Sequence, residues 1–250
     1  ESWTVSSDGK TYTFKLKSGV KFSSGNPVTS ADVVFSYNRL KNLKGQPAFV
    51  TDNMASFAAP DPQTVTITLK DVSPDTLSLL TTPSFGVIDS VTAKANGATD
   101  AVGADTADKS EDFMNNQSIG SGPFKVTAFK PESEIDLAKN PNYAGTVAYD
   151  NIIIKNTPDV NIQKTSLEKG DIDFALDIGP EQADGLKGAA GVTVQQSTSL
   201  IIFFLLMNAD ASVSAPTAKN DVRQAIRYAI NYKDYIDLGG GSSITPPGII

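Results

Sequence analysis

The chain contains short segments in which apolar and polar residues alternate, and other segments in which apolar residues recur at helical spacing. This combination limits the possible folds more than any other feature of the sequence. Tyr12, Phe14 and Leu16 alternate with threonines and lysines, which is typical of a half-buried strand. Residues 64–70 show the same period, and two further alternating runs on either side of Lys130 predict a hairpin. The expected fold class is therefore α/β in the mixed, α+β sense.

Helical spacing is clearest in four segments. Thr29 followed by Asp32 resembles a capping box at the start of the first. Gly170 can adopt the left-handed backbone conformation that ends a helix, and it closes the second segment. Asn220 or Asp221 is expected to cap the strongest, which carries an apolar stripe. The expected helices cover about 30–41, 160–169, 180–187 and 222–230.

Apolar runs in the second half predict strands that are covered by neighbours. The order strand, helix, strand around 160–169 indicates a parallel unit with a right-handed crossover. Residues 93–116 show little periodicity and are expected to form a surface excursion with a short helix near Phe113, while 238–243 reads as a flexible connection. The strands expected here are 152–154, 172–174, 192–195 and 200–207.

Charge and composition exclude several kinds of function. The chain has 21 basic and 28 acidic residues, a net charge of −7, without a run of basic residues. Nucleic acid and anionic membrane surfaces are therefore not expected partners, since both attract clustered positive charge. The sequence has no Cys and no His, so a transition-metal site, a Ser-His-Asp nucleophile and a Cys-His nucleophile are not expected. No cofactor is expected either.

The two ends of the sequence predict a fragment of a longer protein. The chain begins at Glu1 with neither Met nor a signal-like segment, and Pro246 to Ile250 is an apolar end. The longest apolar run, Leu200 to Met207, has the length of a buried strand and falls well short of the roughly 20 residues that cross a bilayer.

Several groups of residues occur together in an order that resembles one protein family. They are Gly-Asn-Pro-Val-Thr at 25–29 with Asp-Val-Val-Phe at 32–35, Gly-Ser-Gly-Pro-Phe at 120–124 with Lys-Asn-Pro-Asn-Tyr at 139–143, Gly-Asp-Ile-Asp at 170–173, and Met-Asn at 207–208 with the helix at 221–231. Together they resemble the family 5 extracellular solute-binding proteins, the peptide, oligopeptide and nickel binders of ABC importers.

The resemblance implies a periplasmic-binding-protein type II-like lobe with an extra α+β subdomain. Residues 1–118 would form the extra subdomain of the first lobe, and 119–250 its α/β core subdomain, ending at the hinge. The family's N-terminal strand, second lobe and C-terminal return segment would be absent from this chain. Because such receptors close two lobes around the solute, one lobe is expected to bind weakly.

The resemblance also implies a function, that of the extracytoplasmic solute-binding component of an ABC transporter. Peptide or oligopeptide is the expected solute, and the permease subunits are the expected protein partners. The protein would be periplasmic, or lipid-anchored on the outer face of the cytoplasmic membrane. It would meet the membrane only through the permease or that anchor, and it is not expected to be an enzyme.

Three segments, 83–86, 122–123 and 198–201, are candidates for solute contact. Phe85 lies in a Pro-Ser-Phe-Gly loop that resembles a family loop with an apolar side chain in the site, although a core position is the alternative. Pro123 stands where the resemblance places a cationic residue in nickel binders, which counts against a charged metal chelate. Leu200 begins the long apolar run, whose backbone would suit an extended peptide. The candidates are Ser84, Phe85, Gly122, Pro123, Ser199 and Leu200.

Other functions stay open beside peptide binding. An oligosaccharide or another small solute would suit the same framework, and a sensor that presents solute to a signalling receptor would share its chemistry. A carboxylate-based hydrolase would use Asp171 and Asp173, which share one face of an expected strand. A solvated or capping role is favoured for both aspartates, because no nucleophile or metal partner lies near them in the sequence.

Overall fold

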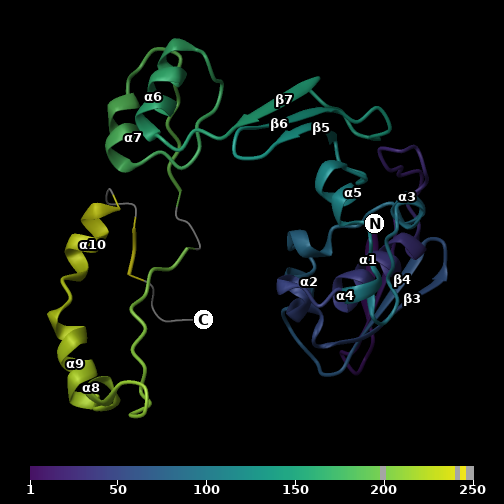
Figure 1. The fold of residues 1–250 in the computed structure, drawn as a ribbon, viewed down its shortest axis with the longest axis horizontal. Helices are drawn as coiled ribbons and strands as arrows, with labels where there is room; N and C mark the ends of the chain where they lie inside the picture. Colours follow the sequence, from purple (N-terminus) through teal and green to yellow (C-terminus); the bar gives the residue numbers. More distant parts are fainter. Residues whose placement is uncertain (198–200, 240–242, 246–250) are drawn as a thin grey trace. The chain divides into compact units, whose positions relative to one another are not determined.

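The computed structural model describes residues 1–197, 201–239 and 243–245. The chain divides into two compact units, Glu1–Asn156 and Thr157–Ile250, and every strand of the described residues lies in the first (Figure 1). The strands are β1 (Ser2–Val5), β2 (Thr11–Lys15), β3 (Met54–Asp61), β4 (Thr64–Leu69), β5 (Phe124–Lys130), β6 (Glu134–Lys139) and β7 (Asn151–Lys155). The α-helices are α1 (Ser30–Asn42), α2 (Thr76–Leu79), α3 (Ser90–Ala95), α4 (Ala104–Ala107), α5 (Glu111–Asn116), α6 (Val160–Lys169), α7 (Pro180–Leu186), α8 (Ala215–Ala218), α9 (Asn220–Ala229) and α10 (Tyr232–Leu238), with short 3-10 helices η1 (Gln46–Thr51) and η2 (Pro83–Phe85).

The core of the first unit lies between α1 and a four-stranded antiparallel sheet of order β1-β2-β4-β3. Tyr12 pairs with Ile67 across β2 and β4, and both side chains point into the core, as the alternating pattern predicts. Tyr37 from α1 meets this layer and packs edge-to-face on Phe57, with ring centres 5.5 Å apart. The prediction of β2, β4 and α1 is confirmed, whereas β1 and β3 were not predicted.

The start of α1 is held by the predicted capping box. Asp32 Oδ2 accepts hydrogen bonds from the Thr29 backbone N–H at 2.8 Å and the Thr29 hydroxyl at 2.7 Å. Asp32 Oδ1 accepts two more, from the Ser90 N–H at 3.0 Å and its hydroxyl at 2.6 Å. One carboxylate therefore joins the first turns of α1 and α3.

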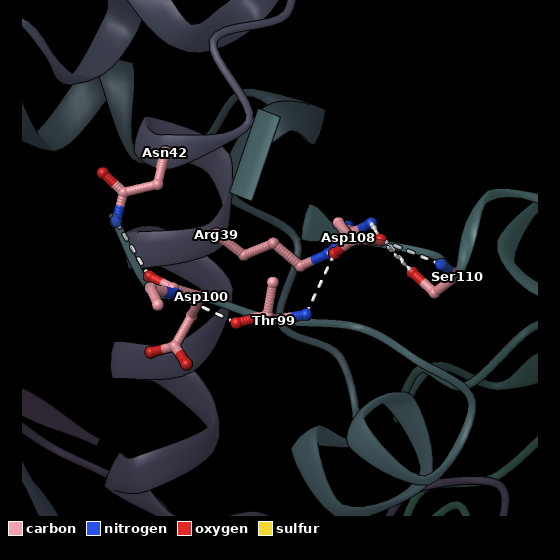
Figure 2. A network of polar contacts seen from close by, with 7 residues as sticks. Arg39, Asn42, Thr99, Asp100, Asp108 and Ser110 are labelled. Carbon is pink, nitrogen blue, oxygen red and sulfur yellow. Dashed lines mark hydrogen bonds and ion pairs between the residues drawn. The ribbon is translucent and has the colours of Figure 1, made fainter. Parts of the chain in front are cut away.

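The surface excursion at 93–116 contains the end of α3 and the two short helices α4 and α5, where one short helix near Phe113 was predicted. An ion pair ties it to α1, since Arg39 Nε lies 2.7 Å from Asp108 Oδ2, which also accepts the Thr99 N–H at 3.1 Å (Figure 2). Asn42 donates to a main-chain carbonyl of the same excursion at 2.8 Å. These contacts order a segment that has little apolar periodicity of its own.

The predicted hairpin forms as β5 and β6, and β7 adds an antiparallel edge strand in the order β5-β6-β7. The prediction of a buried strand at 152–154 is half wrong. The strand forms, but Ile153 is 58% and Ile154 50% exposed. Among the described residues this edge strand pairs only with β6, so its apolar side chains are not covered on both sides.

The helices predicted in the second unit are confirmed. Gly170 ends α6 with a φ of 77°, in the left-handed conformation expected of a C-cap glycine. Pro180 stands in the first turn of α7. One detail was wrong, because α9 begins at Asn220 and its N-cap is Lys219, neither Asn220 nor Asp221. Arg223 donates to the last carbonyls of the preceding helix α8, which holds that boundary.

The strands predicted at 172–174 and 192–195 do not form, and neither does the part of 200–207 that the structure describes, 201–207. The expected parallel unit is therefore also absent from the described residues. Phe203 in this run is 94% exposed. A strand must satisfy its backbone N–H and C=O groups on a neighbour, and the described part of the second unit supplies no such neighbour.

The boundary between the two compact units falls at 156/157 in the sequence, whereas the subdomain boundary implied by the resemblance lies at 118/119. The latter concerns the family's division of its lobe and stays a prediction. Of the helices in the described ranges, none combines the length and apolar character needed to span a membrane.

Candidate functional site

Three segments that overlap the motifs of the family resemblance are hydrogen-bonded in the first unit, and we call residues 23–27, 118–124 and 139–143 together the junction. Its centre is Asn140, which is 2% exposed. The Asn140 backbone N–H donates to the Pro123 carbonyl and its Nδ2 to the Gly122 carbonyl, both at 2.8 Å. A single buried residue therefore fixes the backbone where β5 begins.

Ser23 joins the remaining segments of the junction. Its N–H donates to the Gly120 carbonyl at 2.9 Å, and its hydroxyl donates to the Ser118 carbonyl at 3.1 Å. The Ser23 carbonyl accepts from Asn142 Nδ2 at 3.1 Å. Segments about 100 residues apart in sequence are thus bonded directly.

Gly122 and Pro123 are exposed, while their carbonyls are used inside the junction. A Cβ placed on Gly122 would meet no atom of the described residues within 4 Å. The loop therefore presents an open and apolar surface on a backbone that Asn140 holds by two hydrogen bonds. This is a suitable surface for a ligand, although contact with one stays a prediction.

The Phe85 side chain lies in the core of the first unit and is 4% exposed. Its ring packs edge-to-face on Tyr37, with centres 5.0 Å apart, and Ser84 beside it is half-buried. The chain beyond is held by the Ile88 N–H, which donates to the Ser36 hydroxyl at 3.0 Å. The core alternative is thus what the structure shows for Phe85, and a solute contact by its edge stays a prediction.

The remaining predicted site residues are not brought together with these. Ser199 and Leu200 lie outside the described residues. Asp171 and Asp173 are exposed on a segment that is not a strand, so the shared strand face that a hydrolase would need is missing. Among the described side chains, no group of three or more metal-ligating residues occurs.

Sequence reasoning missed Asp89, whose side chain is fully buried. It is the N-cap of α3, and its Oδ1 accepts the N–H groups of Val91 and Thr92, each at 3.0 Å. Its own N–H donates to the Ile119 carbonyl at 3.0 Å, next to the junction loop. An Asp before Ser-Val-Thr-Ala-Lys is an N-cap signature, so that signal was available in the sequence.

Two hollows in the described part of the first unit are lined by other residues. The larger, about 490 Å³, lies at the C-terminal end of α1 beside Lys41 and the exposed Phe49. The smaller, about 160 Å³, lies between α5 and the β5-β6 hairpin. Neither hollow is lined by Ser84, Phe85, Gly122 or Pro123, the candidate residues that the structure describes.

The family model described as bacterial extracellular solute-binding proteins, family 5 Middle, matches residues 1–248, so the chain belongs to this family. Members of this family are binding proteins. The fold class and the family implied by the motifs are thereby confirmed.

Two curated relatives show the same relationship. The chain is 29% identical over 250 residues to the probable D,D-dipeptide-binding periplasmic protein DdpA of Escherichia coli K12, covering 98% of this chain and 46% of the relative. It is 28% identical to di/tripeptide-binding protein 1 of Pseudomonas aeruginosa, covering 95% and 46%. The chain therefore spans about half the length of the curated relatives it matches.

Solved structures agree on the fold. The periplasmic binding protein DppA from Helicobacter pylori, in complex with the peptide STSA, has a TM-score of 0.72 and 23% identity, covering 96% of this chain and 49% of its own. The binding protein AgaA from A. tumefaciens R10, in complex with agropinic acid, has a TM-score of 0.63 and 28% identity, covering 75% and 36%.

Proposed function

We propose that this chain serves in an extracytoplasmic receptor that binds peptides and delivers them to the permease subunits of an ABC importer. The observation that carries the proposal is the family match over 1–248, joined to relatives named for dipeptide and di/tripeptide binding. A periplasmic relative supports an extracytoplasmic location. We further propose that a lipid anchor attaches the receptor to the outer face of the cytoplasmic membrane.

The proposed contact surface in the first unit consists of the loops 83–86 and 120–123, which contain Ser84 and Pro123. Gly122 and Pro123 support it because they are exposed on a backbone that Asn140 holds rigid. A rigid loop loses little conformational entropy on binding, which favours affinity. Phe85 would act mainly by supporting its loop from the core, and Ser199 and Leu200 complete the proposed set.

Isothermal titration of the complete gene product with di- to hexapeptides tests the proposal. We expect heat of binding from short peptides, with no heat from cello-oligosaccharides in the same buffer. Heat from the sugars alone would remove the peptide function.

A small solute other than a peptide is the second candidate, favoured by the likeness to AgaA, which was solved with agropinic acid. Agropinic acid added as a third arm of the titration separates it from the peptide function. Co-purification of permease subunits with the receptor tests the transport partner, and incorporation of labelled fatty acid tests the lipid anchor.

A further inference from the structure

The buried carboxylate of Asp89 collects hydrogen bonds from two separate parts of the chain. Its Oδ2 accepts from the Ser24 hydroxyl at 2.6 Å, from Asn26 Nδ2 at 2.9 Å and from the Thr92 hydroxyl at 2.6 Å. Its Oδ1 accepts the N–H groups of Val91 and Thr92. All five hydrogen bonds found within the described residues come from neutral donors.

Asp89 also stands between the two loops proposed to meet the solute. It follows Gly86, which ends the Phe85 loop, by three residues. Its N–H donates to the carbonyl of Ile119, which directly precedes the loop 120–123. Through Ser24 and Asn26 it holds the turn whose neighbour Ser23 is bonded to Gly120. The Asp89 side chain thus joins the turn 23–26 to the start of α3, and the Ser23 N–H joins that turn to Gly120 in the loop 120–123.

A carboxylate in this position needs many hydrogen bonds, because burial of a charge costs free energy unless hydrogen bonds compensate. Burial raises the pKa of Asp89, but the hydrogen bonds from Ser24, Thr92 and Asn26 outweigh it and hold the pKa below its usual range. Asparagine has the same shape, yet it would replace the Oδ2 acceptor with an NH₂ donor facing the NH₂ of Asn26. The geometry therefore depends on the carboxylate itself.

We propose that Asp89 is a positioning residue for solute binding, whose buried carboxylate fixes the turn 23–26 against the start of α3 and thereby holds the loop 120–123 in place through the Ser23–Gly120 hydrogen bond. The expected effect on solute affinity rests on the proposed function. The loop arrangement itself can be tested without a solute.

Hydrogen exchange tests the arrangement first, in the complete gene product. In Asp89→Asn we expect the amides of Ser23, Gly25 and Asn26 to exchange on the order of tenfold faster, since their hydrogen bonds hold the turn 23–26 together and join it to the Gly120 carbonyl. Asp108→Asn is the matched control. It weakens the network of Figure 2 in the same unit, and should increase exchange only near 97–110. Unchanged exchange at Ser23, Gly25 and Asn26 in Asp89→Asn overturns the proposal.

An exchange of the two side chains provides a rescue. In Asp89→Asn/Asn26→Asp the new amide at 89 donates to the new carboxylate at 26, and the hydroxyls of Ser24 and Thr92 can turn to accept or donate. We expect the double variant to recover most of the protection that Asp89→Asn loses. Failure to recover any, with the fold intact, contradicts a role through the turn.

Titration with a peptide that the wild type binds measures the consequence. We expect Asp89→Asn to bind on the order of tenfold more weakly, Asp108→Asn to bind like the wild type, and the double variant to recover, at a temperature where all are folded. If the wild type binds and Asp89→Asn binds equally well, the positioning role is wrong. If the wild type binds no peptide at all, the proposed function fails, and the exchange experiment alone decides the loop arrangement.

Discussion

Buried polar side chains decide the shape of the loops in the first unit. Asn140 holds the start of β5, and Asp89 holds the turn 23–26. Asp108 holds the surface excursion that follows α3, up to residue 116. Each satisfies several partners at once, so the loss of one side chain leaves more than one buried group without a hydrogen bond.

The Arg39–Asp108 pair predicts a dependence of stability on pH. Burial raises the pKa of Asp108, but the hydrogen bonds from Arg39 and Ser110 outweigh it and hold the pKa well below its usual range. A depressed folded-state pKa gives stability that is present above the unfolded value of about 3.9 and is lost as pH falls through the folded one.

Asp108→Asn should therefore lower the free energy of unfolding by about 1–3 kcal/mol at pH 7. The difference from the wild type should shrink as the pH falls from 5 to 3. Urea unfolding followed by the fluorescence of Trp3, the single tryptophan, reports on the first unit. A difference that stays constant over this range contradicts the assignment.

The buried amide of Asn140 predicts a second effect on stability. Asn140→Ala removes the donor to the Gly122 carbonyl and the acceptor of the Asn142 N–H, which should cost about 2–4 kcal/mol. Asn116→Ala is the matched control, because its amide donates to a carbonyl on the exposed end of α5 and should change stability by less than about 0.5 kcal/mol. Equal effects would show that burial does not matter at Asn140.

Among the elements, α1, α6, α9 and the β5-β6 hairpin were predictable from the sequence, because their signals are local. A capping box, a C-cap glycine, an apolar stripe and an alternating pair of runs each act within about a dozen residues. Strands β1 and β3 lacked such signals. The lone strands expected after α6 failed because a strand requires a partner, which a local pattern does not supply.

The loop after α2 yields a prediction at the scale of elements. Phe85→Ala should destabilise the first unit by about 3–5 kcal/mol, because the ring fills the core against Tyr37. Phe49→Ala, at a ring that is 69% exposed, should cost less than about 0.5 kcal/mol. Denaturant unfolding compares the two. A small effect for Phe85→Ala, with weaker peptide binding, would instead favour a ring that serves the solute directly.

At the scale of the whole molecule, the second unit leaves large apolar side chains uncovered. Phe203 and Leu206 are 94% and 78% exposed in the run 201–207. Exposed apolar surface of this kind promotes dye binding and association.

The 250-residue chain alone should therefore bind the dye ANS and associate as its concentration rises. Phe203→Ser with Leu206→Ser should reduce both effects, while Val102→Ser, an exposed apolar position in the first unit, should not. Light scattering with size-exclusion chromatography checks this. A monomer without ANS fluorescence at all concentrations contradicts it.

The sequence alone determined the class of fold, the capped helices, the hairpin and the family, because caps and alternation act locally and the order of the motifs is read directly. Only the tertiary structure decided that Phe85 lies in the core, that Asp89 joins the turn 23–26 to α3, and that the apolar run 201–207 is exposed. The physical reason is that burial and hydrogen bonding depend on what covers a residue, and the covering groups come from distant parts of the chain.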